Sequence, residues 1–221
     1  MTQLINPQLL KNGARGIWEG LKYAKYMMFH PFDGSWCAKH EKRGNAGSAT
    51  ILLVILVLVT IFANRASGYI FNYNDPAESN LFAEIIGVLA PLLLWCIVNW
   101  SVTTLMDGEG SFRDIYISTA YAMTPMILFT LLQTVFSWFL TQDGQEIYDL
   151  LGTVGVIWTA FLVFVGMMTI QQYSFKKTIF TIIIDIVGML VVLFLFLLFF
   201  ALIQQLINFL YVLYTEFSLR L

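Results

Sequence analysis

The sequence predicts an all-α integral membrane protein, a bundle of five transmembrane helices preceded by a basic amphipathic helix. Composition is the first observation behind this prediction. The 221 residues are 58% hydrophobic with a mean hydropathy of +0.74, and 12% are charged, against about 25% in a soluble domain. The second observation is that seven of the twelve Lys and Arg residues precede the first long apolar run. A net charge of only -2 gives no basic surface for nucleic acid.

Five segments reach the roughly 20 mostly apolar residues that a helix needs to cross a bilayer. They cover residues 49–63 (beginning near residue 47), 81–106, 115–140, 151–170, and the stretch from residue 178 almost to the C-terminus. Two regions follow from this pattern. Residues 1–46 form a cytosolic or interfacial amphipathic region, and residues 47–221 form the five-helix transmembrane domain.

The N-terminal region carries apolar residues at near-helical spacing, with basic residues between them. This pattern is typical of a helix that lies on the inner leaflet, and a helix packed on the protein's own loops is the alternative. His30-Pro31 should end the helix, and Phe32-Asp33-Gly34 predicts a turn. The candidate membrane-surface residues are Arg15, Trp18, Lys22 and Lys25.

Charge sorts the loops between the apolar segments into two kinds. Basic residues lie before the first segment and between the fourth and fifth, where Lys176 and Lys177 stand. The loop after the third segment has Asp143, Glu146 and Asp149 and no base. The positive-inside rule therefore predicts a cytoplasmic N-terminus and an outer C-terminus, which requires an odd number of spans. The expected location is the cell membrane of a prokaryote, or the ER or Golgi membrane in a eukaryote.

The fifth segment is longer than a single crossing requires. Residues 178–214 would form about 55 Å of helix, against about 30 Å of hydrocarbon. Gln204, Gln205 and Asn208 are interpreted as the exit from the hydrocarbon, with residues 206–214 as an extension at the outer interface. No loop residues interrupt the run, so a sixth span is not expected.

Polar residues inside the apolar segments are the main candidates for a function. Asp185 lies among isoleucines in the fifth segment, and Asn99 lies in the middle of the second. Carboxylates within a membrane are costly and suggest a proton or cation relay; the alternative is that both residues hydrogen-bond neighbouring helices and fix their packing. Pro91 and Pro125 should kink their segments, and Gly152 with Gly155 suits a close helix approach.

No pattern of catalytic or cofactor-binding residues stands out. Cys37 and Cys96 are expected at different depths, so no disulfide is predicted. His30, Asp33, Cys37 and His40 have spacings that fit no standard zinc site and are better explained as an interfacial loop anchored by Phe32 and Trp36. Neither GxSxG, HExxH, Walker A nor GxGxxG occurs. We therefore expect no enzyme activity, no cofactor and no metal.

One polar loop motif stands between the second and third segments. It reads Asp107-Gly108-Glu109-Gly110-Ser111-Phe112-Arg113-Asp114, and Ala120-Tyr121-Ala122 and Thr124-Pro125 follow it. The two glycines allow a short hairpin that packs the two segments antiparallel. Ser111 and Asp114 suit a capping box, and Tyr121 and Pro125 should face one side. The candidate functional or packing residues are thus Asp185, Asn99, Gly108, Gly110, Ser111, Phe112, Tyr121 and Pro125.

This motif resembles that of the Yip1 domain family, whose members have five transmembrane helices and a cytosolic N-terminus. The resemblance implies a membrane-organising rather than a catalytic role. Eukaryotic members resemble trafficking factors that contact Rab GTPases and curve membranes. The present sequence lacks their long Pro/Gly-rich cytosolic arm, which suggests a prokaryotic member without a Rab partner.

Two functions follow from these observations. The first is a non-enzymatic scaffold that organises the bilayer or other integral membrane proteins, for example as an accessory subunit of a transporter permease. The second is a small transporter or channel that uses Asp185 and Asn99. Expected partners are the lipid bilayer, other integral membrane proteins and, as a further option, a second copy of the chain.

Overall fold

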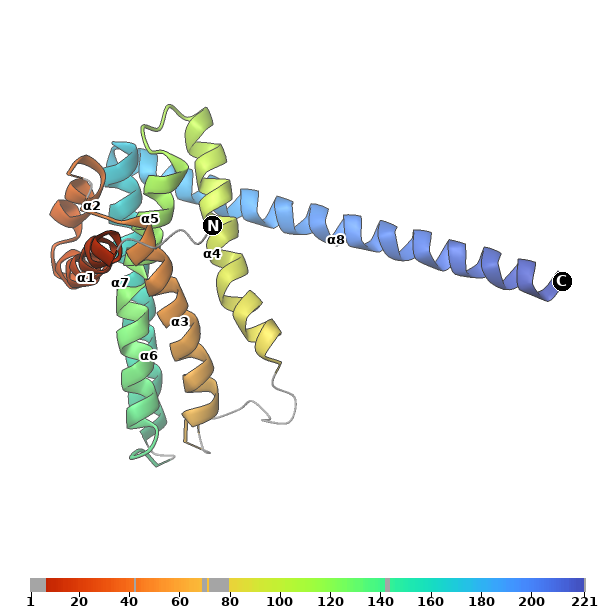
Figure 1. Ribbon diagram of the computed structural model, residues 1–221, viewed down its shortest axis with the longest axis horizontal. Coiled ribbons are helices and arrows are strands. Elements are labelled where there is room, and N and C mark those ends of the chain that lie inside the picture. The colour runs from red at the N-terminus through yellow and green to blue at the C-terminus, as the bar shows by residue number, and fades with distance from the viewer. Residues whose placement is uncertain (1–6, 42, 69–70, 72–79, 142–143, 221) are drawn as a thin grey trace.

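Eight α-helices make up the structure of the protein, a computed structural model (Figure 1). It describes the backbone of residues 7–41, 43–68, 71, 80–141 and 144–220, and the side chains of the same ranges within residues 18–216. No strand occurs in these ranges. The helices are α1 (Pro7–Phe29), α2 (Pro31–His40), α3 (Ala46–Ala66), α4 (Leu81–Leu105), α5 (Phe112–Ala122), α6 (Thr124–Phe136), α7 (Gln145–Gln171) and α8 (Phe175–Arg220).

The prediction of five apolar spans is confirmed in the described part of the chain. The helices long and apolar enough to cross a membrane are α3, α4, α5 together with α6, α7, and α8. The side chains that they bury are often polar, including Asn99, Thr103, Thr134 and Asp185, while many Leu, Ile and Phe side chains face outward. This distribution suits a chain whose surroundings are lipid, because an outward apolar side chain costs nothing there.

The third span is divided between two helices at Met123. Pro125 lies in the first turn of α6, where its missing N–H is not needed. Further along a continuous helix, its ring would clash with the carbonyl of Tyr121. Thr124 Oγ1 instead donates a hydrogen bond to the Tyr121 carbonyl, so the freed acceptor is satisfied. The expected kink is thus a break, with Tyr121 and Pro125 both buried beside it.

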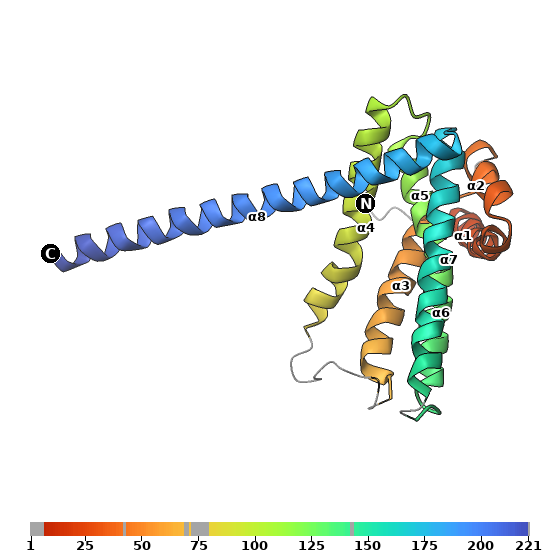
Figure 2. The same ribbon diagram turned by 180° about the vertical axis from the view of Figure 1, so that it is seen from behind.

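Helices α6 and α7 pack side by side and extend furthest below α5, with α3 against α6 (Figures 1 and 2). Two glycines of α7 bring the α6–α7 pair close together. A Cβ atom on Gly155 would lie 2.7 Å from Phe129 Cβ, and one on Gly152 would lie 2.5 Å from Gln133 Nε2. The close approach predicted for these two glycines is confirmed.

The described second half of α1 packs against the bundle. Tyr23, Ala24 and Met27 are buried in the same core as Leu52 and Leu56 of α3. A Cβ on Gly20 would overlap Ser48 Oγ of α3, so α1 touches the first span along this face. In this half of α1, one side thus contacts protein, while Trp18, Lys22 and Lys25 are exposed.

The turn expected at Phe32-Asp33-Gly34 is wrong, because Pro31 opens helix α2 there. Proline suits the first turn of a helix, and the carboxylate of Asp33 favours the same turn. Gly34 lies where α2 crosses α1, and a Cβ on it would come within 2.9 Å of Met27 Cα. The residues that suggest a turn in sequence thus start a helix and allow it to pack closely. The break at His30 is confirmed, since this residue has φ -126° and ψ 68°.

Helix α8 leaves the bundle after its first few turns (Figures 1 and 2). It contacts α4 and, less extensively, α7. Its only buried described residues are Thr178, Thr181 and Asp185, and its most apolar window has no buried residue. The 46-residue helix is uninterrupted, as the absence of a loop in the sequence predicts.

Replacing Gly155 with leucine should loosen the α6–α7 pair. The added side chain has no room beside Phe129, and overpacking costs about 1–3 kcal/mol. Thermal unfolding of the purified protein in detergent measures the effect. Gly87→Leu in α4 is the matched control, because nothing lies within 4 Å of a Cβ at Gly87. Equal losses in the two variants would contradict the packing role of Gly155.

Candidate functional site

Asp185 and Asn99, which the sequence singles out separately, meet in the interior. Asn99 Nδ2 donates a hydrogen bond of 2.7 Å to Asp185 Oδ2 and lies 3.4 Å from Met167 Sδ. Asp185 is fully buried and Asn99 is 2% exposed. The other carboxyl oxygen, Asp185 Oδ1, has no hydrogen-bond partner in the described structure. Asn99 therefore joins α4 to both α7 and α8.

Gln171, at the end of α7, extends this contact into a polar junction, which we define as Asn99, Thr103, Gln171 and Asp185. Thr103 Oγ1 donates to the Asn99 carbonyl at 2.6 Å, and Gln171 Nε2 donates to Thr103 Oγ1 at 3.2 Å. The amide oxygen of Gln171 in turn accepts from the backbone N–H of Gly110 at 2.9 Å. A chain of hydrogen bonds thus connects the interior to the loop between α4 and α5.

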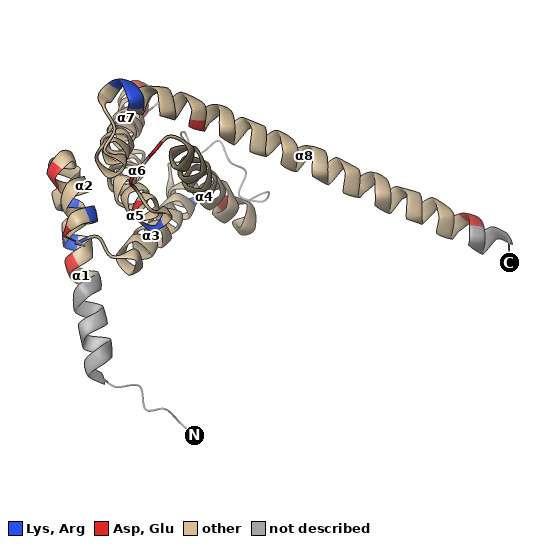
Figure 3. Cartoon of the chain, turned by 90° about the horizontal axis from the view of Figure 1, so that it is seen from above, with Lys and Arg blue, Asp and Glu red and all other residues tan. Residues whose placement is uncertain are grey.

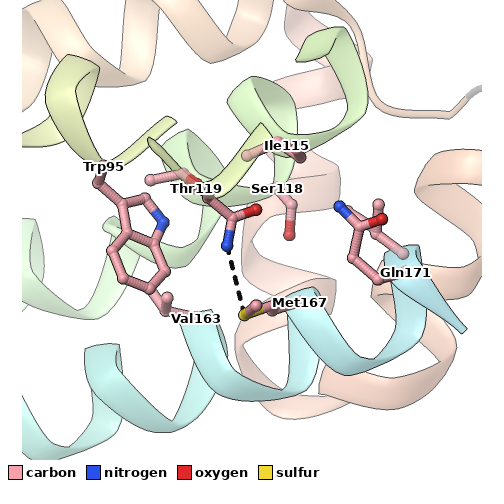
Figure 4. A pocket seen from close by; sticks show the side chains of 9 residues that line it. Trp95, Ile115, Ser118, Thr119, Val163, Met167 and Gln171 are labelled. Carbon is pink, nitrogen blue, oxygen red and sulfur yellow. Dashed lines mark hydrogen bonds between the residues drawn. The ribbon is translucent and has the colours of Figure 1, made fainter. Parts of the chain in front are cut away.

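A small cavity lies beside the polar junction (Figure 4). Its volume is about 10 Å³, which is close to the space that one water molecule requires. Ser118, Thr119 and Gln171 bring polar groups to its wall. The dashed line in Figure 4 marks the hydrogen bond from Asn99 Nδ2 to Met167 Sδ. The cavity is lined by Trp95, Asn99, Ile115, Ser118, Thr119, Val163, Met167, Ile170 and Gln171. This space suits a single bound water rather than a path for a solute.

The two loop glycines are required by close packing rather than by backbone conformation. No described glycine has a positive φ, and the left-handed residue of the loop is Asp107, with φ 54°. A Cβ on Gly108 would lie 2.4 Å from Gln171 Oε1, and one on Gly110 would lie 2.6 Å from Ile170 Cγ2. The predicted contact between the second and third spans is confirmed, but the glycines make room for the end of α7.

Two lysines bind the carboxyl ends of the helices that meet here. Lys177 Nζ donates to the Met106 carbonyl at 2.7 Å, and Lys39 Nζ donates to the Ile170 carbonyl at 2.8 Å. A cation at a helix C-terminus is favourable because the last carbonyls carry partial negative charge. Lys177 lies 4.1 Å from the ring centroid of Tyr173. No ion pair joins Lys177 to Asp185 in the part of the chain that the structure describes.

Tyr173 ties the α7–α8 connection to the end of α4. Its hydroxyl donates to the Met106 carbonyl at 3.0 Å. Burial raises the pKa of Tyr173, and the charges of Asp107 and Asp185 raise it further. The hydroxyl therefore stays protonated and keeps its hydrogen bond throughout the physiological pH range.

The remaining residues of the loop motif have structural contacts. Ser111 and Asp114 form the expected capping box at the start of α5, which confirms that prediction. Phe112 is partly exposed and meets Trp100 edge-on at 6.1 Å. Tyr121 is 1% exposed and lies edge-on to Tyr23 of α1, with ring centroids 6.1 Å apart.

The candidate membrane-surface residues lie on α1, away from the polar junction. Trp18 is 61% exposed, and Lys22 Nζ is 5.7 Å from its ring centroid. Lys25 is exposed as well, whereas the side chain of Arg15 lies outside the described residues. Figure 3 shows basic residues on α1 and α2 and at the start of α8, while most of α8 is uncharged.

The histidines and the cysteine near α2 do not form a shared site. His30 stacks on Tyr26 and His40 stacks on Trp36, and Cys37 is a free thiol. Among the described residues, no group of three or more His, Cys, Asp or Glu side chains could hold a metal ion.

Buried polar residues other than Asn99 and Asp185 have only a weak signal in the sequence. Thr178 and Thr181 recur at helical spacing with Asp185, and this polar stripe could have been recognised as the buried face of α8. Gln171, by contrast, stands at the end of an apolar segment among other polar residues. Only the packing of α7 against the α4–α5 loop distinguishes it.

Comparison with known proteins gives one match. The Yip1 domain matches residues 25–201, well over half of the chain. No curated protein and no solved structure matches significantly.

Asn99→Leu should destabilise the protein by about 1–3 kcal/mol, because Asp185 would lose its hydrogen-bond donor while it stays buried. Adding Asp185→Leu should recover part of this loss, since no unpaired acceptor would remain. Chemical or thermal unfolding of both single variants and the double variant in detergent gives the coupling between the two sites. Strictly additive losses would show that the pair does not stabilise the junction.

Proposed function

This chain belongs to the Yip1 domain family, and on that premise we propose that it organises other integral membrane proteins without catalysing a reaction. It is a multi-pass membrane protein whose helices account for nearly all of the described residues. An accessory subunit of a transporter permease is one form of this function. We keep the N-terminus on the cytoplasmic side and the C-terminus outside as part of the proposal.

The observation that carries the proposal is the length and exposure of α8. The span assigned to it has 42 residues, or about 63 Å of helix, which is about twice the hydrocarbon thickness. Beyond the contacts of its first turns with α4 and α7, most of its surface is exposed in the described chain (Figures 1 and 2). A helix of this kind offers a long surface to another membrane protein.

Polar residues on the outer half of α8 indicate where a partner would bind. Gln204 and Asn208 are one helical turn apart and exposed, and Gln205 is beside them. None of the three amides has a hydrogen-bond partner among the described residues. Amides on membrane helices favour association, because each can donate to and accept from a neighbouring helix. The partner surface is thus expected to carry polar groups, as a permease helix or a second α8 would.

The second candidate is a small transporter or channel that uses Asp185 and Asn99. The observation in its favour is the unpaired Asp185 Oδ1, whose carboxyl group is hydrogen-bonded to Asn99 in the wall of the small cavity. The cavity is too small for a continuous path, so transport would require the helices to move. The scaffold is the better supported of the two candidates.

Gln204→Leu combined with Asn208→Leu should reduce partner capture at least tenfold, because the amides are lost while the bundle keeps its contacts. Co-purification from native membranes in a mild detergent, with partners identified by mass spectrometry, measures capture. Leu206→Ala with Leu210→Ala is the control on the opposite face of the same turns. Unchanged capture by the amide variant would exclude this face as the binding surface.

Asp185→Asn distinguishes the two candidate functions. The amide can still hydrogen-bond Asn99, so a packing role should leave partner capture unchanged and alter mainly stability. A proton- or cation-coupled transporter should instead lose its flux, because asparagine does not ionise. Ion flux into liposomes that contain the purified protein is the measurement. Flux that Asp185→Asn abolishes would replace the scaffold with the transporter.

A further inference from the structure

A second, larger cavity lies between α1 and the start of α3, far from the polar junction. Its volume is about 620 Å³, which is in the usual range for a small-molecule site. Side chains of both charge signs and two aromatic rings line it. The lining residues are Glu19, Gly20, Lys22, Tyr23, Tyr26, Arg43 and Asn45.

The two cations of this cavity come from different parts of the chain. Lys22 belongs to α1 and makes no ion pair in the described structure, where its ammonium lies near the Trp18 ring. Arg43 precedes α3, and its Nε lies 2.7 Å from Glu41 Oε2. In the described chain, no hydrogen bond uses the terminal amino groups of Arg43. Two sets of N–H donors are therefore available to an anionic group.

Glu19, Tyr23 and Tyr26, which belong to α1 like Lys22, add a carboxylate and two aromatic rings to the lining. Tyr23 and Tyr26 stack with ring centroids 5.8 Å apart. Burial raises the pKa of Tyr23, so its hydroxyl stays neutral and donates to the Gly34 carbonyl. Tyr26 also stacks on His30, so the carboxylate of Glu19, rather than an aromatic face, is the group that would bind an ammonium. The cavity thus combines donors for an anion with acceptors for a cation.

The position of the cavity places it where lipid headgroups lie. Asn45 caps α3, and its side chain accepts from the Gly47 N–H. Because α3 is the first apolar span, residue 45 marks the point at which the chain enters the membrane. The N-terminal end of α3 adds a partial positive charge there.

We propose that this cavity binds the headgroup of a zwitterionic membrane phospholipid. Lys22 and Arg43 bind the phosphate through charge-assisted hydrogen bonds, and Glu19 binds the headgroup ammonium. An anionic headgroup is less suitable because Glu19 would repel it. Free phosphate would leave most of the volume and the aromatic wall unused.

Native mass spectrometry of the full-length protein in detergent tests this site. The probes are phosphatidylethanolamine, phosphatidylglycerol and inorganic phosphate, each added separately. Lys22→Ala with Arg43→Ala removes the phosphate donors. Arg113→Ala with Lys176→Ala is the matched control, because it removes the same charge from two exposed residues that do not line the cavity.

The wild type and the control should retain phosphatidylethanolamine, and the cavity variant should retain at least tenfold less. Glu19→Gln should shift the preference toward phosphatidylglycerol if the carboxylate selects the ammonium. Equal retention by the cavity variant and the control would overturn the site, and so would binding of inorganic phosphate as tight as that of the lipid. The site does not involve α8, so loss of lipid and loss of partner capture remain separate outcomes.

Discussion

The hydrogen bond between Asn99 and Asp185 is the contact on which the attachment of α8 to the bundle depends. A carboxyl group surrounded by apolar side chains must find a partner within the protein, and α8 has few other means of attaching to the bundle. Its described buried residues are all polar, and its apolar surface can be covered equally well by lipid. Polar pairing therefore holds α8 where the hydrophobic effect cannot distinguish one position from another.

The same constraint explains the loops at this end of the bundle. The C-termini of α4 and α7 meet there, and each leaves carbonyl groups that require donors. Lys177, Lys39 and Tyr173 supply these donors across chain segments that are far apart in sequence. The glycines of the α4–α5 loop then allow Gln171 to approach the backbone. The polar junction and the α4–α5 loop are thus held together by the hydrogen bonds of Gln171.

Two of the four residues of the polar junction were predicted as candidates, but the contact between them was not. Asp185 and Asn99 are conspicuous as polar residues in apolar segments, so sequence alone identifies both. Their pairing depends on the crossing of α4 and α8, which hydropathy does not encode. The capping box at Ser111 was predictable because its residues are local. The turn expected at Gly34 was wrong because Pro31 opens a helix there, and only the crossing of α2 over α1 shows why a glycine stands at this position.

The sequence by itself determined the number of spans, their approximate ends and the membership of the Yip1 domain family. These properties depend on the length of apolar runs, on local capping and on a short motif, all of which are read along the chain. Only the tertiary structure decided which polar residues meet, how α1 and α2 pack against the bundle, and that most of α8 projects from it. Such features arise from contacts between distant segments, and in lipid many alternative apolar packings have similar free energies.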